Sequence, residues 1–147
     1  MKIINSSEKK EILEKLNYQF GIKNLPYLLI RFGQDKIRLY SGNLSKDDIK
    51  NLDKNTKIDN IGLYFAKIQN DGIRLTIDGV QLIKNEITKN ILEINDETAI
   101  KWLRGNDLDI KTDKSFKIIK NNNEFLGCGK STEDKITNFV PKERRIK

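Results

Sequence analysis

The segment Gly127-Cys128-Gly129-Lys130-Ser131 contains residue types found in nucleotide-binding loops and a candidate nucleophile. A Walker phosphate loop ends in Gly-Lys-Ser but also needs a glycine five residues earlier, and that position here is Glu124. A dinucleotide loop needs a third glycine and a following helix, whereas this segment has the pattern of a strand that leads into a turn. We expect its small residues to let that strand pack closely against another element.

Cys128 is the only cysteine, and the chain has no histidine. A cysteine nucleophile needs a base, and the usual zinc sites and Ser-His triads need imidazole or several thiols. We therefore expect Cys128 to be a small buried hydrophobe. A magnesium site made of carboxylates is the remaining alternative, but the acidic residues are scattered through helices and turns without a converging motif. The sequence thus predicts neither an active site nor a cofactor or metal, so we expect a protein that is not an enzyme.

Basic residues are the more informative group. The chain has 28 Lys and Arg against 21 Asp and Glu, a net charge of +7, which is typical of proteins that bind polyanions. Residues 101–147 hold 12 basic and 7 acidic residues, so the excess lies in the last third. A simple abundance of lysine, as in AT-rich genomes, is the alternative explanation. The candidate phosphate-binding residues are Lys101, Arg104, Lys130, Lys142, Arg144 and Arg145; a solvated surface with a frayed terminus is the other interpretation.

The helix that must position Lys101 and Arg104 begins at Asn95 or Asp96 and runs through Leu103, before Gly105. Residues three apart on a helix share one face. Trp102 lies on the same helix, where it either stacks on a base or anchors the helix, and the sequence favours anchoring.

The remaining elements alternate between helices and short strands. A capping box at Asn5 and Glu8, with Ser6 or Ser7 as other candidate caps, predicts a helix with an apolar face that Gly21 ends. A short helix capped by Ser45 is predicted, followed by a loop rich in Lys, Asn and Asp. A hairpin of strands 63–69 and 73–77 is predicted around Asn70-Asp71-Gly72, followed by a helix capped by Asp78. The predicted strands are 27–32, 36–40, 63–69, 73–77, 91–94, 116–120, 125–130 and 136–140.

Three ordered segments carry a family resemblance. Residues 100–108, Ile-Lys-Trp-Leu-Arg-Gly-Asn-Asp-Leu, resemble the helix-to-strand junction of PUA-like RNA-binding domains. Residues 125–130 resemble the central PUA strand. Residues 138–145 are similar to the closing segment of the PUA domain in Sun/Fmu-type rRNA cytosine-5 methyltransferases. Residues 61–67 and 74–76 resemble the segment before PUA in two-domain ribosome-biogenesis factors.

This resemblance implies an α+β fold: an N-terminal α/β pre-PUA-like domain (1–88) packed on a C-terminal PUA-like half-open β-barrel (89–147). It implies that the partner is RNA, either rRNA or tRNA, and that the RNA runs close to Gly105. It also implies binding without catalysis, because neither proline precedes a cysteine as in the Pro-Cys nucleophile motif of those methyltransferases.

We therefore expect a non-catalytic RNA-binding protein of rRNA maturation or ribosome biogenesis. Two alternatives remain: an accessory subunit that delivers RNA to a separate methyltransferase or tRNA-modifying enzyme, and a protein-interaction adaptor with an incidental basic surface. For the RNA-binding protein and for the accessory subunit, the expected protein partners are an RNA-modifying enzyme or pre-ribosomal proteins. The apolar runs are too short to cross a bilayer and the N-terminus lacks a secretory pattern, so a cytoplasmic location without membrane contact is expected.

Overall fold

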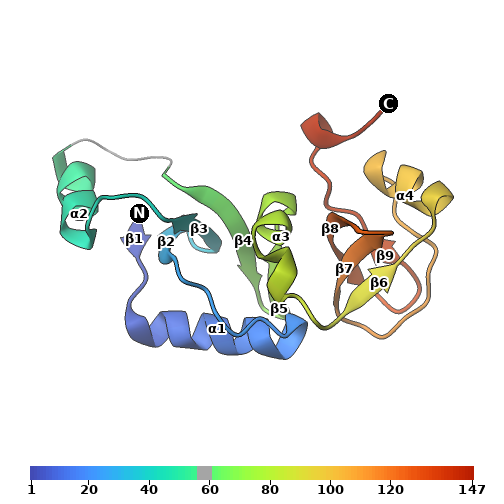
Figure 1. The fold of residues 1–147 in the computed structure, drawn as a ribbon, viewed down its shortest axis with the longest axis horizontal. Coiled ribbons are helices and arrows are strands. Elements are labelled where there is room, and N and C mark those ends of the chain that lie inside the picture. Colours follow the sequence, from blue (N-terminus) through green and yellow to red (C-terminus); the bar gives the residue numbers. More distant parts are fainter. Residues whose placement is uncertain (56–60) are drawn as a thin grey trace.

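The computed structural model of the protein describes residues 1–55 and 61–147, and it has mixed helix and strand content, as predicted (Figure 1). The first part contains β1 (Lys2–Ile3), α1 (Ser6–Phe20), β2 (Leu28–Phe32), β3 (Lys36–Tyr40), α2 (Lys46–Asn55), β4 (Leu63–Gln69), β5 (Gly72–Leu75), α3 (Ile77–Ile83) and the 3-10 turn η1 (Lys84–Glu86). The second part contains β6 (Ile91–Glu93), α4 (Asp96–Leu103), β7 (Phe116–Asn121), β8 (Glu124–Ser131), β9 (Ile136–Thr137) and the 3-10 turn η2 (Lys142–Arg144).

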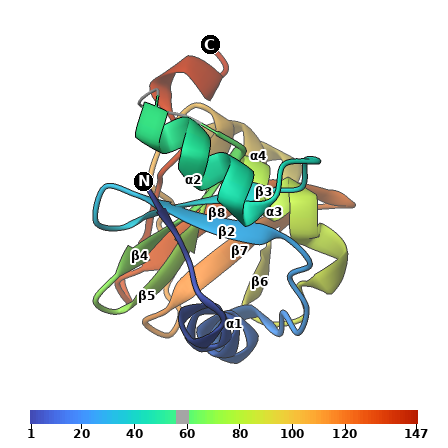
Figure 2. The same cartoon turned by 90° about the vertical axis from the view of Figure 1, so that its left-hand side faces the viewer.

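Two sheets form the framework. The first is antiparallel with the order β1-β2-β3-β4-β5, and the second has the order β6-β7-β8-β9 with β6 parallel to β7. Helices α1 and α2 lie on opposite sides of the first sheet, and α3 lies between β4 and β8 (Figures 1 and 2). The second sheet, with α4 beside it, fits a PUA-like half-open barrel.

The helix starts follow the polar residues that the sequence offers. Asn5 caps α1 by accepting a hydrogen bond from the Glu8 amide at 2.8 Å, and Gly21, with φ of 76°, ends the helix. Ser45 and Asp48 cap α2 reciprocally, each side chain accepting from the other's amide at 3.1 Å. The short helix predicted after Ser45 is present and runs to Asn55; residues 56–60, in the loop predicted to follow it, lie outside the described residues.

Two predicted boundaries are wrong. The second hairpin strand ends at Leu75, because Thr76 rather than Asp78 caps α3: its hydroxyl accepts from the Gly79 amide at 2.9 Å and donates to the Tyr64 carbonyl at 2.7 Å. The last strand ends at Thr137 rather than at residue 140. There the Asn138 side chain binds backbone groups in place of a neighbouring strand.

Two hydrophobic cores share strand β7. The first core lies between α1, α3 and the first sheet, and it also includes Phe116, Ile118 and Cys128 from the second sheet. The second core surrounds Trp102 and contains Ile119. Because successive residues of a strand point to opposite faces, β7 forms a wall of both cores. The first core therefore crosses the predicted boundary near residues 84–91, and the division at 88/89 stays a prediction.

Candidate nucleic-acid interface

Helix α4 is fixed to β8 by Trp102. The Asn95 side chain caps the helix by accepting from the Thr98 amide at 2.8 Å. The Trp102 side chain is fully buried, and its indole N–H donates to the Leu126 carbonyl at 2.8 Å. The prediction that Trp102 anchors the helix is therefore confirmed. Lys101 and Arg104 are both exposed, and neither side chain has an ion pair within the part of the chain that the structure describes.

Gly105 follows α4 in a left-handed conformation, with φ of 92°. The Asn106 amide donates to the Lys101 carbonyl at 3.1 Å, which closes the last turn. A Cβ atom at Gly105 would lie 2.3 Å from Nε of Arg145. The glycine therefore gives the Arg145 side chain room to lie directly across the end of the helix.

The C-terminal segment is held against α4 by hydrogen bonds rather than frayed. The Ile146 amide donates to the Leu103 carbonyl at 3.0 Å, and Nε of Arg145 donates to the Val140 carbonyl at 3.0 Å. Arg144 extends away and pairs with Asp78 of α3 at 3.1 Å. These contacts bring Lys101, Arg104, Gly105 and Arg145 to one corner of the molecule, which we call the α4–tail corner; the exposed Lys142 lies in the same tail.

Lys130 has a different neighbourhood. Its ammonium pairs with Asp71 in the β4–β5 turn and lies 5.7 Å from the centre of the Phe116 ring. The hydrogen bond from Lys130 holds the pKa of Asp71 below its usual range. No contact among the described residues joins Lys130 to the α4–tail corner, so the structure does not group it with the other predicted site residues.

Asn138 and Asp107 organise the corner, and the sequence analysis gave neither a role. The Asn138 amide side chain donates to the Trp102 and Asn106 carbonyls at 2.8 and 2.9 Å. The Asn138 backbone N–H donates to Asp107 at 2.9 Å and, with Lys135, lowers the pKa of the Asp107 carboxyl. Asparagine readily caps backbone groups, but Asn138 lies inside the predicted strand 136–140 and follows only the observed strand, which ends at Thr137. Its target carbonyls, more than thirty residues away, are visible only in the fold.

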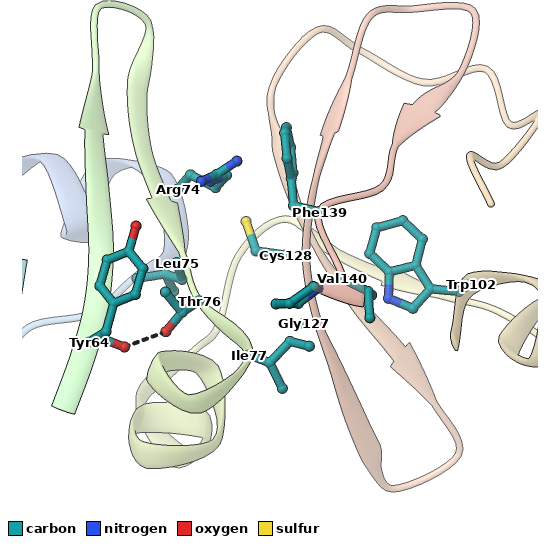
Figure 3. Close-up of a pocket in the computed structure, with 11 residues that line it drawn as sticks. Tyr64, Arg74, Leu75, Thr76, Ile77, Trp102, Gly127, Cys128, Phe139 and Val140 are labelled. Carbon is teal, nitrogen blue, oxygen red and sulfur yellow. Dashed lines mark hydrogen bonds between the residues drawn. The ribbon is translucent and has the colours of Figure 1, made fainter. Parts of the chain in front are cut away.

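A pocket lies where the two sheets meet, next to the tail (Figure 3). The Arg74 guanidinium lies 4.2 Å from the centre of the Phe139 ring, and the two side chains project to the same side of the pocket (Figure 3). Tyr64 and Cys128 also line it. Burial raises the pKa of the Cys128 thiol to about 12, so this sulfur is a poor nucleophile at neutral pH. The prediction of a small buried hydrophobe is confirmed.

The described residues, 1–55 and 61–147, contain no group of three or more His, Cys, Asp or Glu side chains arranged to hold a metal ion. Within the same ranges no helix is both long and apolar enough to span a bilayer.

Comparison with known proteins gives two results. Residues 89–146, which run from the residues before β6 to Ile146, match the family described as the methyltransferase RsmF PUA domain. Over 95% of its length the chain is 27% identical to the ribosomal RNA small subunit methyltransferase F of Psychromonas ingrahamii, and it spans 30% of the length of that relative. The family match is to a PUA domain and not to a catalytic domain. The segment 89–146 is therefore similar to the PUA domain of methyltransferase RsmF, which confirms the Sun/Fmu-type resemblance of its helix and strands.

Proposed function

We propose that the protein binds RNA at the α4–tail corner and acts in rRNA maturation without catalysing a reaction itself. The observation that carries the proposal is the position of Arg145. Its guanidinium lies over Gly105, next to the helix that carries Lys101 and Arg104, and none of these three cations pairs with an acid among the described residues. Unpaired cations held at one corner are suited to phosphate oxygens, and arginine can grip them bidentately.

The similarity to a PUA domain supports RNA as the partner, and the similarity to an rRNA methyltransferase supports rRNA. In this proposal residues 89–147 form the RNA-binding domain and residues 1–88 form a second domain packed on it. Arg144 contributes less directly, because it must first exchange its carboxylate partner Asp78 for a phosphate. Lys142, in the same tail, is a further member of the proposed site. Lys130, paired with Asp71, is a peripheral member of the site.

A second candidate function is favoured by the curated relative, which is a methyltransferase and is similar to nearly the whole chain. In this second function, the protein delivers RNA to a separately encoded methyltransferase. Affinity capture with and without RNase separates the two functions. A methyltransferase that stays bound after RNase treatment supports the accessory subunit, whereas loss of all partners supports RNA binding alone.

RNA affinity measured at several salt concentrations tests the site. Binding releases counterions, so log K falls with log salt by roughly 0.7 per phosphate contacted on a single strand. The variant Arg145→Ala is expected to flatten this slope by about 0.7, and Arg144→Ala/Arg145→Ala by up to about 1.4. The matched control is Lys10→Ala, which removes an exposed cation on α1. Equal slopes for Arg145→Ala and the control would refute the site.

A further inference from the structure

The face of the first sheet that points away from its core carries a row of aromatic and basic side chains. In β3, Ile37 and Leu39 point into the core, so Lys36 and Arg38 point outward. Arg38 pairs with Tyr64 across the β3–β4 ladder. The ladder shifts register between Ile37 and Arg38, which places both Phe65 and Ala66 in the core and leaves Tyr64 on the outer face.

The cations of this face are held against the rings. The Arg38 guanidinium lies 5.8 Å from the Phe32 ring centre and 6.0 Å from the Tyr64 ring centre, and it donates to the Gly62 carbonyl at 2.7 Å. The Lys36 ammonium lies 5.9 Å from the centre of the Tyr64 ring. The positive groups and the aromatic surfaces are therefore fixed next to one another before any ligand arrives.

The same arrangement continues across the junction to the second sheet. Arg74 of β5 lies on the Phe139 ring, and both side chains line one pocket with Tyr64 (Figure 3). The residue after Phe139 is Val140, whose carbonyl holds Arg145 of the α4–tail corner. The row, which we call the aromatic–basic strip, consists of Phe32, Lys36, Arg38, Tyr64, Arg74 and Phe139, and it leads to the proposed phosphate-binding corner.

Charge identifies the ligand class. Lys36, Arg38 and Arg74 form no ion pair within residues 1–55 and 61–147, and Asp35, the residue before Lys36, is paired with Lys67 at 3.7 Å. Positive charge attracts phosphate, and partly exposed rings provide surfaces on which bases stack. A duplex hides the faces of its bases in its own stack, whereas an unpaired strand presents them.

We propose that the aromatic–basic strip binds an unpaired segment of RNA, with bases stacked on Tyr64 and Phe139 and phosphates on Lys36, Arg38 and Arg74. The inference rests on the proposed function and adds a second surface to it. The α4–tail corner grips phosphates, and the strip gives the preference for single-stranded RNA.

Fluorescence anisotropy with two labelled probes tests the strip: a 12-nucleotide oligouridine, and an RNA hairpin with a long stem and a four-nucleotide loop. The variants Tyr64→Leu and Phe139→Leu keep an apolar side chain but remove the ring. Stacking is worth about 1–3 kcal/mol per base, so each is expected to weaken oligouridine binding by about 5-fold or more. The change in the logarithm of the affinity for the hairpin should be less than half of the change for oligouridine. The matched control is Tyr18→Leu, which removes an 83% exposed tyrosine on α1 and should bind both probes like the unchanged protein.

The outcomes separate this inference from the proposed function. If the ring variants bind oligouridine as the unchanged protein does while Arg145→Ala weakens both probes, the strip is wrong and the function stands. If the unchanged protein binds neither probe, both are wrong. Equal displacement of oligouridine by polyglutamate at matched charge would show a general anion surface and would also overturn the strip.

A second variant guards against loss of fold. Lys36→Gln changes an exposed side chain of β3, and its melting curve should match that of the unchanged protein. It is expected to flatten the salt slope for oligouridine by about 0.7, the value for one phosphate. Photocrosslinking of 4-thiouridine in the oligomer should label peptides that contain Tyr64 or Phe139. Crosslinks confined to the α4–tail corner would contradict the proposal.

Discussion

Replacing Gly129 by alanine should destabilise the protein by overpacking the joint between α4 and β8. A Cβ atom at this position would lie 2.6 Å from Cγ2 of Ile136, 2.7 Å from Cη2 of Trp102 and 3.0 Å from the Thr137 carbonyl oxygen. Ile136 and Trp102 are fully buried, so neither can move into solvent. Gly129 is not among the glycines with positive φ, so the effect is steric rather than a consequence of backbone strain.

Overpacking of a core costs about 1–3 kcal/mol. For a chain of this size each kcal/mol lowers the melting temperature by about 2–4 °C, so Gly129→Ala is expected to lower it by about 2–12 °C. Far-UV circular dichroism during heating and urea titration measures both quantities. The urea slope should stay unchanged, since the surface exposed on unfolding is the same.

A double substitution tests the steric reason directly. Trp102→Phe removes the outer ring of the indole and the hydrogen bond to Leu126, and by itself it destabilises the protein. It also removes Cη2 of Trp102, one of the three atoms that the new methyl group would meet. The combined loss should therefore fall short of the sum of the two single losses by at least about 0.5 kcal/mol, the usual scale for coupled neighbours. Additive losses, or an unchanged melting temperature for Gly129→Ala, would refute the reasoning.

Three further predictions concern single groups. Cys128, buried and with its thiol pKa raised to about 12, should react with a thiol reagent only as fast as the protein unfolds; rapid labelling in native buffer would contradict this. The hydrogen bond from the buried Lys117 lowers the pKa of Asp113 to about 2, so its stabilising effect is present above pH 4 and is lost as the pH falls through 2. Urea midpoints at pH 2–5 should therefore fall more steeply for the unchanged protein than for Asp113→Asn, and parallel curves would argue against the pair. Gly105→Ala places a side chain at φ of 92° and displaces Arg145, so we expect weaker RNA binding with a flatter salt slope. The circular dichroism spectrum should stay unchanged, as the control for folding. Unchanged RNA binding would remove Gly105 from the site.

The helices and hairpins were predictable because their signals are local. Asn5 caps α1 through its own side chain, and helical spacing identifies the buried face of that helix. The burial of Trp102 was also predictable, since a large apolar side chain on a short amphipathic helix favours the core. The glycine pattern located Gly105 at the end of α4, and the family resemblance implied an RNA path close to it.

The contacts that define the surfaces depend on tertiary structure and have no such signal. Arg74 and Phe139 are separated by more than sixty residues and meet only because β5 and the segment after β9 lie side by side. The role of Thr76 as the cap of α3 was missed because its neighbour Asp78 is an equally good capping residue in isolation. The Thr76 hydroxyl is selected by a second bond, to the Tyr64 carbonyl, that the sequence does not reveal.

The shared strand β7 has a consequence for the proposed RNA-binding surfaces. Ile118 belongs to the first core and its neighbour Ile119 to the second. A hinge rotation between the two sheets would have to pull one of these side chains out of its core, so the sheets are coupled as a rigid pair. The separation between the aromatic–basic strip and the α4–tail corner is then fixed before binding. If both proposed surfaces bind RNA, this fixed spacing would favour RNA in which a bound phosphate and an unpaired base lie one set distance apart.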